Sequence, residues 1–192
     1  MAQESSISNN REELINSNDL LLDHERTVLK KYFNSTSHNV QDDKTDPLKI
    51  TSFGEPPTKL TSNGVWVGNF YDVHMTPMLQ ELRIQCVINV MGVVPNSIIV
   101  GIPYILYPLP QPQNGEKFDE MSMANAFNIG YAIEKLRAAG YTSVFVHCLS
   151  GIDRGPTIVW KYMVDKLKWK EDDARNHIKK LRPISNIHSD WF

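Results

Sequence analysis

The sequence predicts an α/β fold in which a central, mostly parallel sheet is flanked by helices. From Val65 onward, short apolar runs alternate with longer segments of helical periodicity, which is the pattern of strands connected by helices. The most hydrophobic run, at 141–147, leads directly into a loop and a helix start. With 192 residues, of which 41% are hydrophobic, the chain can build one core of ordinary size plus an appendage.

The elements follow in order along the chain. We expect strands at 65–67, 86–90, 104–107 and 141–147, and helices at 77–83, 118–139, 158–168 and 171–181. The helix at 118–139 has the clearest signal, because apolar residues such as Ile129 and Ile133 recur at helical spacing. Gly140 follows it at the position where helices often take a left-handed residue, and Arg182-Pro183 ends the last helix.

The N-terminal third differs in composition from the rest. Its first 60 residues hold seven Lys and Arg against ten Asp and Glu, whereas the remainder holds thirteen against twelve. We therefore predict a polar, acidic extension at 1–62 and one domain at 63–192. Within the extension, 20–33 has loosely helical apolar spacing and is expected to dock on the core, and the proline-containing stretch 34–61 is expected to be a linker.

Composition narrows the function classes. The net charge is −2 with six neutral His, so no nucleic-acid partner is expected, and the apolar runs are too short to span a membrane. Residues 1–10 are polar and resemble no targeting signal. The two cysteines, Cys86 and Cys148, are typical of a reducing compartment, which predicts the cytoplasm or the nucleus. No feature indicates an oligomeric state.

The stretch from His147 to Thr157 carries the candidate site. Cys148 leaves the buried strand, five residues intervene, and Arg154 precedes the helix that Pro156 starts. A tight loop at a helix N-terminus turns backbone N–H groups inward, and the helix dipole and a forked guanidinium add positive charge. We therefore expect a phosphate-binding loop between the last core strand and this helix. The same field favours a thiolate at Cys148.

Residues of this loop have separate expected roles. His147 is expected to hold the loop by hydrogen bonding its backbone, and Gly151 to supply a positive φ or a close backbone approach. The expected phosphate-binding residues are Leu149, Ser150, Gly151, Ile152, Asp153 and Arg154. A packed structural thiol beside a surface arginine is the alternative, and it leaves the combination of histidine, glycine, strand and helix start unexplained.

Residues from about Gly64 to Pro183 resemble the atypical dual-specificity branch of the cysteine-dependent protein tyrosine phosphatases. Beyond the signature at 147–154, Val65–Asn69 resembles the family's opening strand, and 79–90 resembles its next helix and strand. The resemblance implies a two-step mechanism in which Cys148 attacks phosphorus, a cysteinyl-phosphate forms and water hydrolyses it, with no metal or cofactor.

Two positions depart from the family's pattern. Gln111 stands where the family places an aspartate that acts as general acid, and Gln cannot protonate a leaving group. Gly155 stands where the family places a Ser or Thr whose hydroxyl eases departure of the cysteine sulfur. Thr157 is expected to support the loop; it is also the alternative source of that hydroxyl, although it lies further along the helix.

Three carboxylates are candidates for the missing acid. Asp153 lies inside the loop beside Arg154 and resembles the arrangement in myotubularin-like phosphatases, although an ion pair with Arg or Lys that shapes the loop is an equal alternative. Glu116 and Asp119 lie on the segment after Gln111, but Asp119 is also placed to favour the start of a helix.

These features predict a phosphatase that acts on phosphotyrosine and phosphoserine or phosphothreonine in proteins. No Lys or Arg lies between Cys148 and Arg154, which favours singly phosphorylated groups. The alternatives are a weakly active or inactive protein that binds phosphoprotein or a scaffold partner, and a phosphatase for a lipid, glucan or RNA 5′-phosphate. Cys86 could trap an oxidised Cys148, but its apolar strand favours a packed core thiol.

Overall fold

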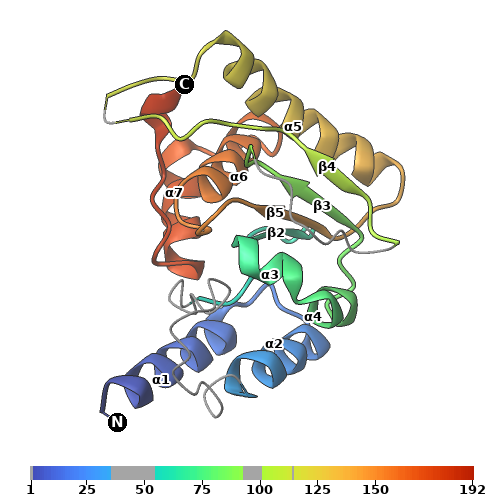
Figure 1. The fold of residues 1–192 in the computed structure, drawn as a ribbon, viewed down its shortest axis with the longest axis vertical. Coiled ribbons are helices and arrows are strands. Elements are labelled where there is room, and N and C mark those ends of the chain that lie inside the picture. The colour runs from blue at the N-terminus through green and yellow to red at the C-terminus, as the bar shows by residue number, and fades with distance from the viewer. Residues whose placement is uncertain (1, 36–54, 93–100, 114) are drawn as a thin grey trace.

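The computed structural model describes residues 2–35, 55–92, 101–113 and 115–192, and Figure 1 shows helices on both faces of a sheet. The strand order in these residues is β1-β2-β5-β3-β4, formed by Thr58–Lys59, Val65–Gly68, Val144–His147, Cys86–Asn89 and Tyr104–Leu106. β2, β5, β3 and β4 are parallel, and β1 is antiparallel at one edge. The predicted α/β class with a mostly parallel sheet is confirmed.

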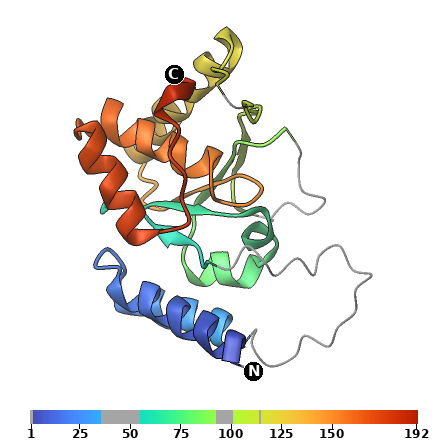
Figure 2. The same cartoon turned by 90° about the vertical axis from the view of Figure 1, so that its left-hand side faces the viewer.

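Two layers of helices enclose the sheet. The described helices are α1 Ala2–Ser17, α2 Asp23–Ser35, α3 Phe70–His74, α4 Thr76–Glu81, α5 Glu120–Ala138, α6 Arg154–Asp165 and α7 Glu171–Leu181, with a 3₁₀ turn at Ser189–Trp191. Figures 1 and 2 show α5, α6 and α7 on one side, and α1 to α4 on the other. Strands β1, β2, β5 and β3 are therefore buried on both faces, whereas β4 at the edge is only partly buried.

Alternate residues of each strand face opposite layers. Val65 and Val67 belong to the core shared with α5, α6 and α7, whereas Trp66 between them belongs to the core shared with α1, α2 and α4. In β5, Val146 and Phe145 divide in the same way. Successive side chains of a strand point to opposite faces, so two buried faces require the nearly continuous apolar runs seen in the sequence.

The prediction that 34–61 is a linker is wrong for the last residues of this stretch. Thr58 and Lys59 form β1 and pair with Val67 and Trp66 of β2, so the sheet begins before the linker was expected to end. Residues 36–54 of this stretch lie outside the described residues. A strand of two residues is too short to show periodicity, and its pairing depends on a partner elsewhere in the chain.

Several boundaries differ from those predicted. The helix expected to start at Pro156 and to continue to 168 covers Arg154–Asp165, and Pro156 lies within its first turn, where proline is tolerated. α5 begins at Glu120 rather than at 118, since Asp119 is its N-cap and accepts a hydrogen bond from the backbone of Ser122. Gly140 has a φ of +91°, which confirms its predicted left-handed conformation.

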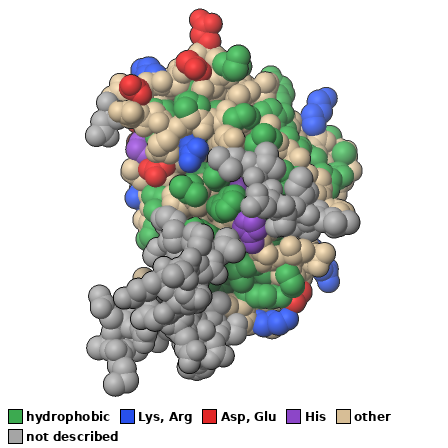
Figure 3. Space-filling view, in the orientation of Figure 1, with side chains coloured by type: hydrophobic (Ala, Val, Ile, Leu, Met, Phe, Trp, Pro, Cys, Tyr) green, Lys and Arg blue, Asp and Glu red, His purple; other side chains and the backbone are tan. Residues whose placement is uncertain are grey.

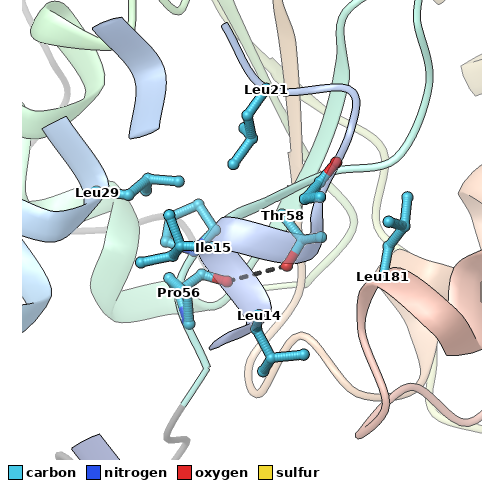
Figure 4. A pocket seen from close by; sticks show the side chains of 9 residues that line it. Leu14, Ile15, Leu21, Leu29, Pro56, Thr58 and Leu181 are labelled. Atoms are coloured by element: carbon cyan, nitrogen blue, oxygen red, sulfur yellow. Dashed lines mark hydrogen bonds between the residues drawn. The ribbon is translucent and has the colours of Figure 1, made fainter. Parts of the chain in front are cut away.

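The N-terminal helices are docked on the core. The helix expected at 20–33 is confirmed as α2, whereas α1 and α3 were not predicted. In Figure 4, Ile15 of α1, Leu21 and Leu29 surround a small cavity together with Pro56 and with Thr58 of β1. These apolar contacts explain why α1 is stable although most of its residues are polar.

A buried ion pair fixes α2 to β1. Lys59 Nζ lies 2.9 Å from Oε1 and 3.0 Å from Oε2 of Glu25, and both side chains are less than a tenth exposed. Glu25 also accepts a hydrogen bond from the backbone of Leu22, and Asn18 donates to the carbonyl of Lys59. The extension is thus joined to the sheet by polar contacts that water cannot easily replace.

We expect Glu25→Ala to lower the free energy of unfolding by about 3 to 5 kcal/mol, because it leaves the Lys59 ammonium buried without a partner. Lys31→Ala, which removes the exposed pair with Glu81, is the control and should change stability little. Urea unfolding measures both. Similar losses in the two variants would contradict the role assigned to burial.

Candidate active site

The loop between β5 and α6 carries the predicted signature. β5 ends at His147, the loop occupies 148–153, and α6 begins at Arg154. Cys148 is buried, whereas Leu149 beside it is exposed. The structure therefore places the cysteine and the arginine at the two ends of one loop, as predicted.

Four carbonyls of this loop accept hydrogen bonds from the surrounding structure. His147 Nδ1 lies 3.3 Å from the oxygen of Cys148, and the backbone of Phe70 donates to Leu149 at 3.0 Å. Arg182 Nε donates to Gly151 at 3.0 Å, and the backbone of Asn186 donates to Ile152 at 2.8 Å. In a planar trans peptide the N–H points opposite to the C=O. The N–H groups of the residues that follow, Leu149, Ser150, Ile152 and Asp153, are thereby turned toward the inside of the loop.

Gly151 meets both requirements that the sequence left as alternatives. Its φ is +70°, in the region that side chains disfavour. A Cβ atom at this position would also lie 2.7 Å from Arg182 Nη2 and 2.8 Å from the oxygen of Gly68. Any side chain here would displace both the loop and the arginine behind it.

Arg182 is a functional residue that sequence reasoning missed, since it was predicted only to end a helix. Its side chain is fully buried, and Nη1 donates to the carbonyl of Pro56 at 2.7 Å and to Thr58 Oγ1 at 2.9 Å. Burial lowers the pKa of Arg182, and the charges of Glu55 and Asp72 oppose that shift. The guanidinium links α7, the segment before β1 and the loop at Gly151.

The unpredicted helix α3 supports the start of the loop. The side chain of Asn69 caps this helix by accepting hydrogen bonds from the backbone of Tyr71 and Asp72. The side chain of Asp72 in turn accepts a hydrogen bond from the backbone N–H of Asn69. Burial raises the pKa of Asp72 to about 7. The pattern Asn-x-x-Asp is a capping box, so a signal for this helix was present in the sequence.

His147 holds the loop as predicted, and a chain of side chains fixes its tautomer. Nδ1 must donate because the carbonyl of Cys148 can only accept, so Nε2 accepts from the hydroxyl of Tyr104 at 2.9 Å. That hydroxyl accepts in turn from Asn89 at 2.8 Å. Burial lowers the pKa of His147 to about 4, so the imidazole is neutral at physiological pH. Tyr104 and Asn89 come from two other strands and carried no signal in the sequence.

Arg154 joins the loop to the segment after β4. Its Nη1 donates to the carbonyl of Leu109 at 3.1 Å, and Leu109 is buried. The segment that contains Gln111 therefore lies beside the loop, where the family's acid was expected. Gln111 itself is exposed, and the segment supplies a backbone carbonyl rather than a carboxylic acid.

The three candidate acids occupy different environments. Glu116 is exposed and accepts a hydrogen bond from the backbone of Gln113. Asp119 caps α5, and hydrogen bonds from Ser122 lower its pKa, which disfavours proton donation. Asp153 alone of the three lies within the loop. Its carboxyl group contacts Nε2 of His188 at 2.8 Å, so its described partner is an imidazole and not the Arg or Lys of the alternative.

The structure shows which groups the Thr157 hydroxyl contacts and how much space lies between Gly155 and the sulfur of Cys148. Thr157 Oγ1 donates to the carbonyl of Asn186 at 3.3 Å and accepts from the backbone of His188 at 3.1 Å, so it supports the C-terminal segment. Thr157 therefore has a supporting role, and its hydroxyl does not replace the missing one. A Cβ atom at Gly155 would lie 3.6 Å from the sulfur of Cys148, with no contact under 3.5 Å.

Cys86 cannot bridge to Cys148 within this fold. It pairs with Val144 on the neighbouring strand β5, and Cys148 lies four residues further along, or roughly 13 Å away at the rise of a strand. Burial raises the pKa of Cys86 to about 11. The expectation of a packed core thiol is confirmed.

Within the described ranges, no helix combines the length and apolarity needed to cross a bilayer. The same ranges contain no cluster of three or more His, Cys, Asp or Glu side chains placed to hold a metal ion.

The fold and the loop together define a cysteine-dependent phosphatase domain: a mostly parallel sheet, a cysteine after its central strand, and an arginine at the following helix start. The sequence model of the family "Dual specificity phosphatase, catalytic domain" matches residues 65–190. The chain therefore belongs to the dual-specificity phosphatase family.

Individual relatives agree with this assignment. The chain is 30% identical over 131 residues to the tyrosine-protein phosphatase vhp-1 of Caenorhabditis elegans. The aligned region covers 68% of this chain and 19% of that protein. The chain is 30% identical over 142 residues to dual specificity protein phosphatase 1 of Mus musculus, covering 74% and 34%. The chain thus spans about a fifth to a third of these relatives. The crystal structure of DUSP15 matches with a TM-score of 0.59 and 25% identity, covering 70% of this chain and 81% of that one.

The neutral state of His147 predicts a pH dependence of stability. Its pKa falls from 6.5 to about 4 on folding, so the unfolded chain binds a proton in this range that the folded chain does not. The stability it contributes is present above pH 6.5 and is lost as the pH falls toward 4. We expect the urea midpoint to drop more between pH 7 and pH 5 in the wild type than in His147→Gln.

The comparison of the wild type with His147→Gln separates the contribution of His147 from that of Asp72. Asp72 is present in both proteins, and its effect on the pH dependence of stability has the opposite sign. Its raised pKa makes the folded chain hold a proton that the unfolded chain loses, so its contribution falls as the pH rises toward 7. Equal drops in the wild type and His147→Gln would refute the neutral, buried imidazole.

Proposed function

We propose that this chain hydrolyses phosphate monoesters through a cysteinyl-phosphate on Cys148. The observation that carries the proposal is the loop whose carbonyls are bonded from outside, which leaves several N–H groups directed inward between Cys148 and Arg154. Such a set of donors at the start of α6 binds the oxygens of a phosphoryl group, and the arginine adds two forked donors. The site thus combines a nucleophile with a binding site for the charge that develops on phosphorus.

The reaction proceeds in two displacements. The thiolate of Cys148 forms a bond to phosphorus while the bond to the leaving oxygen breaks, and Asp153 gives that oxygen a proton. Water then attacks phosphorus and gives a proton to the Asp153 carboxylate, the sulfur–phosphorus bond breaks, and the thiolate and inorganic phosphate are released. Asp153 takes the acid role because Gln111 has no acidic proton and Asp119 is engaged in capping α5.

We further propose that the substrates are singly phosphorylated proteins bearing phosphotyrosine, phosphoserine or phosphothreonine. The names of the relatives support this class, and so does the loop, which has no cation between Cys148 and Arg154 to hold a second phosphate. In Figure 3, Lys and Arg side chains are dispersed singly over the face shown, so this face offers no concentrated charge for a polyanion. The two free thiols support action in the cytoplasm or nucleus.

A second candidate function is phosphoprotein binding with little turnover. Gln111 and Gly155 favour it, because they remove the usual acid and the usual hydroxyl without disturbing the loop's donors. Both functions require the same loop, and they differ in whether Cys148 is consumed and regenerated.

We expect Cys148→Ser to abolish hydrolysis of an aryl phosphate while oxyanion binding persists in part, because the loop and Arg154 supply the binding. Arg154→Ala should lose both activities, since two forked donors disappear. Steady-state turnover and isothermal titration with phosphate test these expectations. A Cys148→Ser variant with wild-type turnover would show that the sulfur is not the nucleophile.

The absence of a hydroxyl beside the sulfur predicts burst kinetics. Without that donor the thiolate is a poorer leaving group, so we expect one equivalent of phenol to be released quickly, followed by a slow steady state. Gly155→Ser has room for its Cβ 3.6 Å from the sulfur and should raise the steady rate without changing the burst. Rapid-quench measurements test this.

Thr157→Val is the matched control for the burst, because the Thr157 hydroxyl is bonded to the 186–188 segment. It should leave the burst unchanged. A linear time course in the wild type, or a burst that Gly155→Ser leaves with the same slow phase, would contradict a role for the missing hydroxyl.

A further inference from the structure

A histidine from the C-terminal segment contacts the loop carboxylate. His188 Nε2 lies 2.8 Å from Oδ1 of Asp153, and Asn186 Nδ2 lies 3.2 Å from the same oxygen and 2.9 Å from His188 Nε2. Asp153 stands at the N-cap of α6, yet its side chain makes no capping bond to that helix. The hydrogen bonds described for this carboxylate all fall on Oδ1, and all come from a segment more than thirty residues away in sequence.

The structure holds His188 in place on several sides. Its ring stacks on Trp191, with centroids 4.1 Å apart and planes nearly parallel, and Trp191 is buried against Phe118. Its backbone N–H donates to Thr157, and the backbone of Asn186 donates to the loop carbonyl of Ile152. The imidazole is therefore presented to Asp153 by a segment that is itself bonded to the loop and to α6.

We propose that His188 is a positioning residue that prepares Asp153 to donate the leaving-group proton, an inference that rests on the phosphatase function proposed above. In the tautomer that carries its proton on Nε2, the imidazole donates to Oδ1, which leaves Oδ2 to carry the proton that Asp153 gives to the leaving group. When that proton passes to the leaving oxygen as the phosphorus–oxygen bond breaks, Asp153 becomes a carboxylate. The bond from His188 then becomes charge-assisted and stronger, so it stabilises the transition state more than the ground state.

The same arrangement serves the second displacement. The carboxylate held by His188 and Asn186 can accept a proton from the attacking water on Oδ2, which restores the carboxylic acid as phosphate forms. Proton number balances over one turnover, and the imidazole keeps its own N–H throughout. Asp190, whose carboxylate lies 3.9 Å from Nδ1, faces the other edge of the ring.

The decisive variant is His188→Phe, which keeps an aromatic ring for Trp191 but removes the donor. We expect kcat/KM for phenyl phosphate, a poor leaving group, to fall about 10- to 100-fold, the size of one hydrogen bond to a charged group. Dinitrophenyl phosphate, whose leaving group needs no proton, should change little. His188→Gln retains an N–H donor and should recover part of the loss on phenyl phosphate.

Two further comparisons separate positioning from packing. In an Asp153→Asn background, His188→Phe should cause no additional loss on phenyl phosphate, because the group it positions is gone. His177→Phe is the matched control, since His177 is also half-buried, bonds to the carbonyl of Leu60 and contacts Trp169 outside the loop. It should leave both substrates unaffected.

The possible failures are distinguishable. A wild-type chain that hydrolyses neither ester would overturn the phosphatase function and this inference with it. If Asp153→Asn slows both esters equally, Asp153 is not the acid and His188 has nothing to position. If Asp153→Asn is selective for phenyl phosphate but His188→Phe is not, or if the two losses multiply, the role of His188 alone is refuted.

Discussion

One buried guanidinium determines how the loop is held. Removing the charge of Arg182 from water is costly unless its N–H groups find partners, and Nε and Nη1 find them in the carbonyls of Gly151 and Pro56 and in the hydroxyl of Thr58. The loop, the edge of the sheet and the end of α7 must therefore assemble together. Because Gly151 faces this group directly, its lack of a side chain is a requirement of packing as well as of φ.

The sequence predicted what depends on neighbouring residues. Four of the five described strands, most of the described helices, the turn at Gly151 and the bond from His147 to the loop follow from local pattern, and the structure agrees. The sequence could not predict that Tyr104, Arg182 and His188 contact the loop region, because each does so from a segment 30 to 45 residues away in sequence. β1 was missed because a two-residue strand exists only through its partner, and α3 was missed although its capping box was readable.

The loop around Cys148 lies among positively charged, neutral and acidic side chains. Arg154 and Arg182 contribute positive charge, His147 is neutral, and the raised pKa of Asp72 limits the negative charge that it places near Arg182 near neutral pH. Asp153 is the loop's own acidic residue, and its partner is an imidazole rather than either arginine. Neither arginine is therefore engaged by the acidic residue of the loop: Arg182 donates to Gly151, Pro56 and Thr58, and Arg154 donates to Leu109.

The N-terminal extension belongs to the same network of buried polar contacts. Glu25 of α2 holds Lys59 of β1, Thr58 beside it holds Arg182, and Arg182 holds the loop at Gly151. Each link is a buried polar contact, so loss of one leaves an unsatisfied group rather than a gap that water fills. The boundary expected at residue 62 divides segments that these bonds join. A polar, acidic stretch that looked like an appendage is, through four side chains, part of the support of the candidate active site.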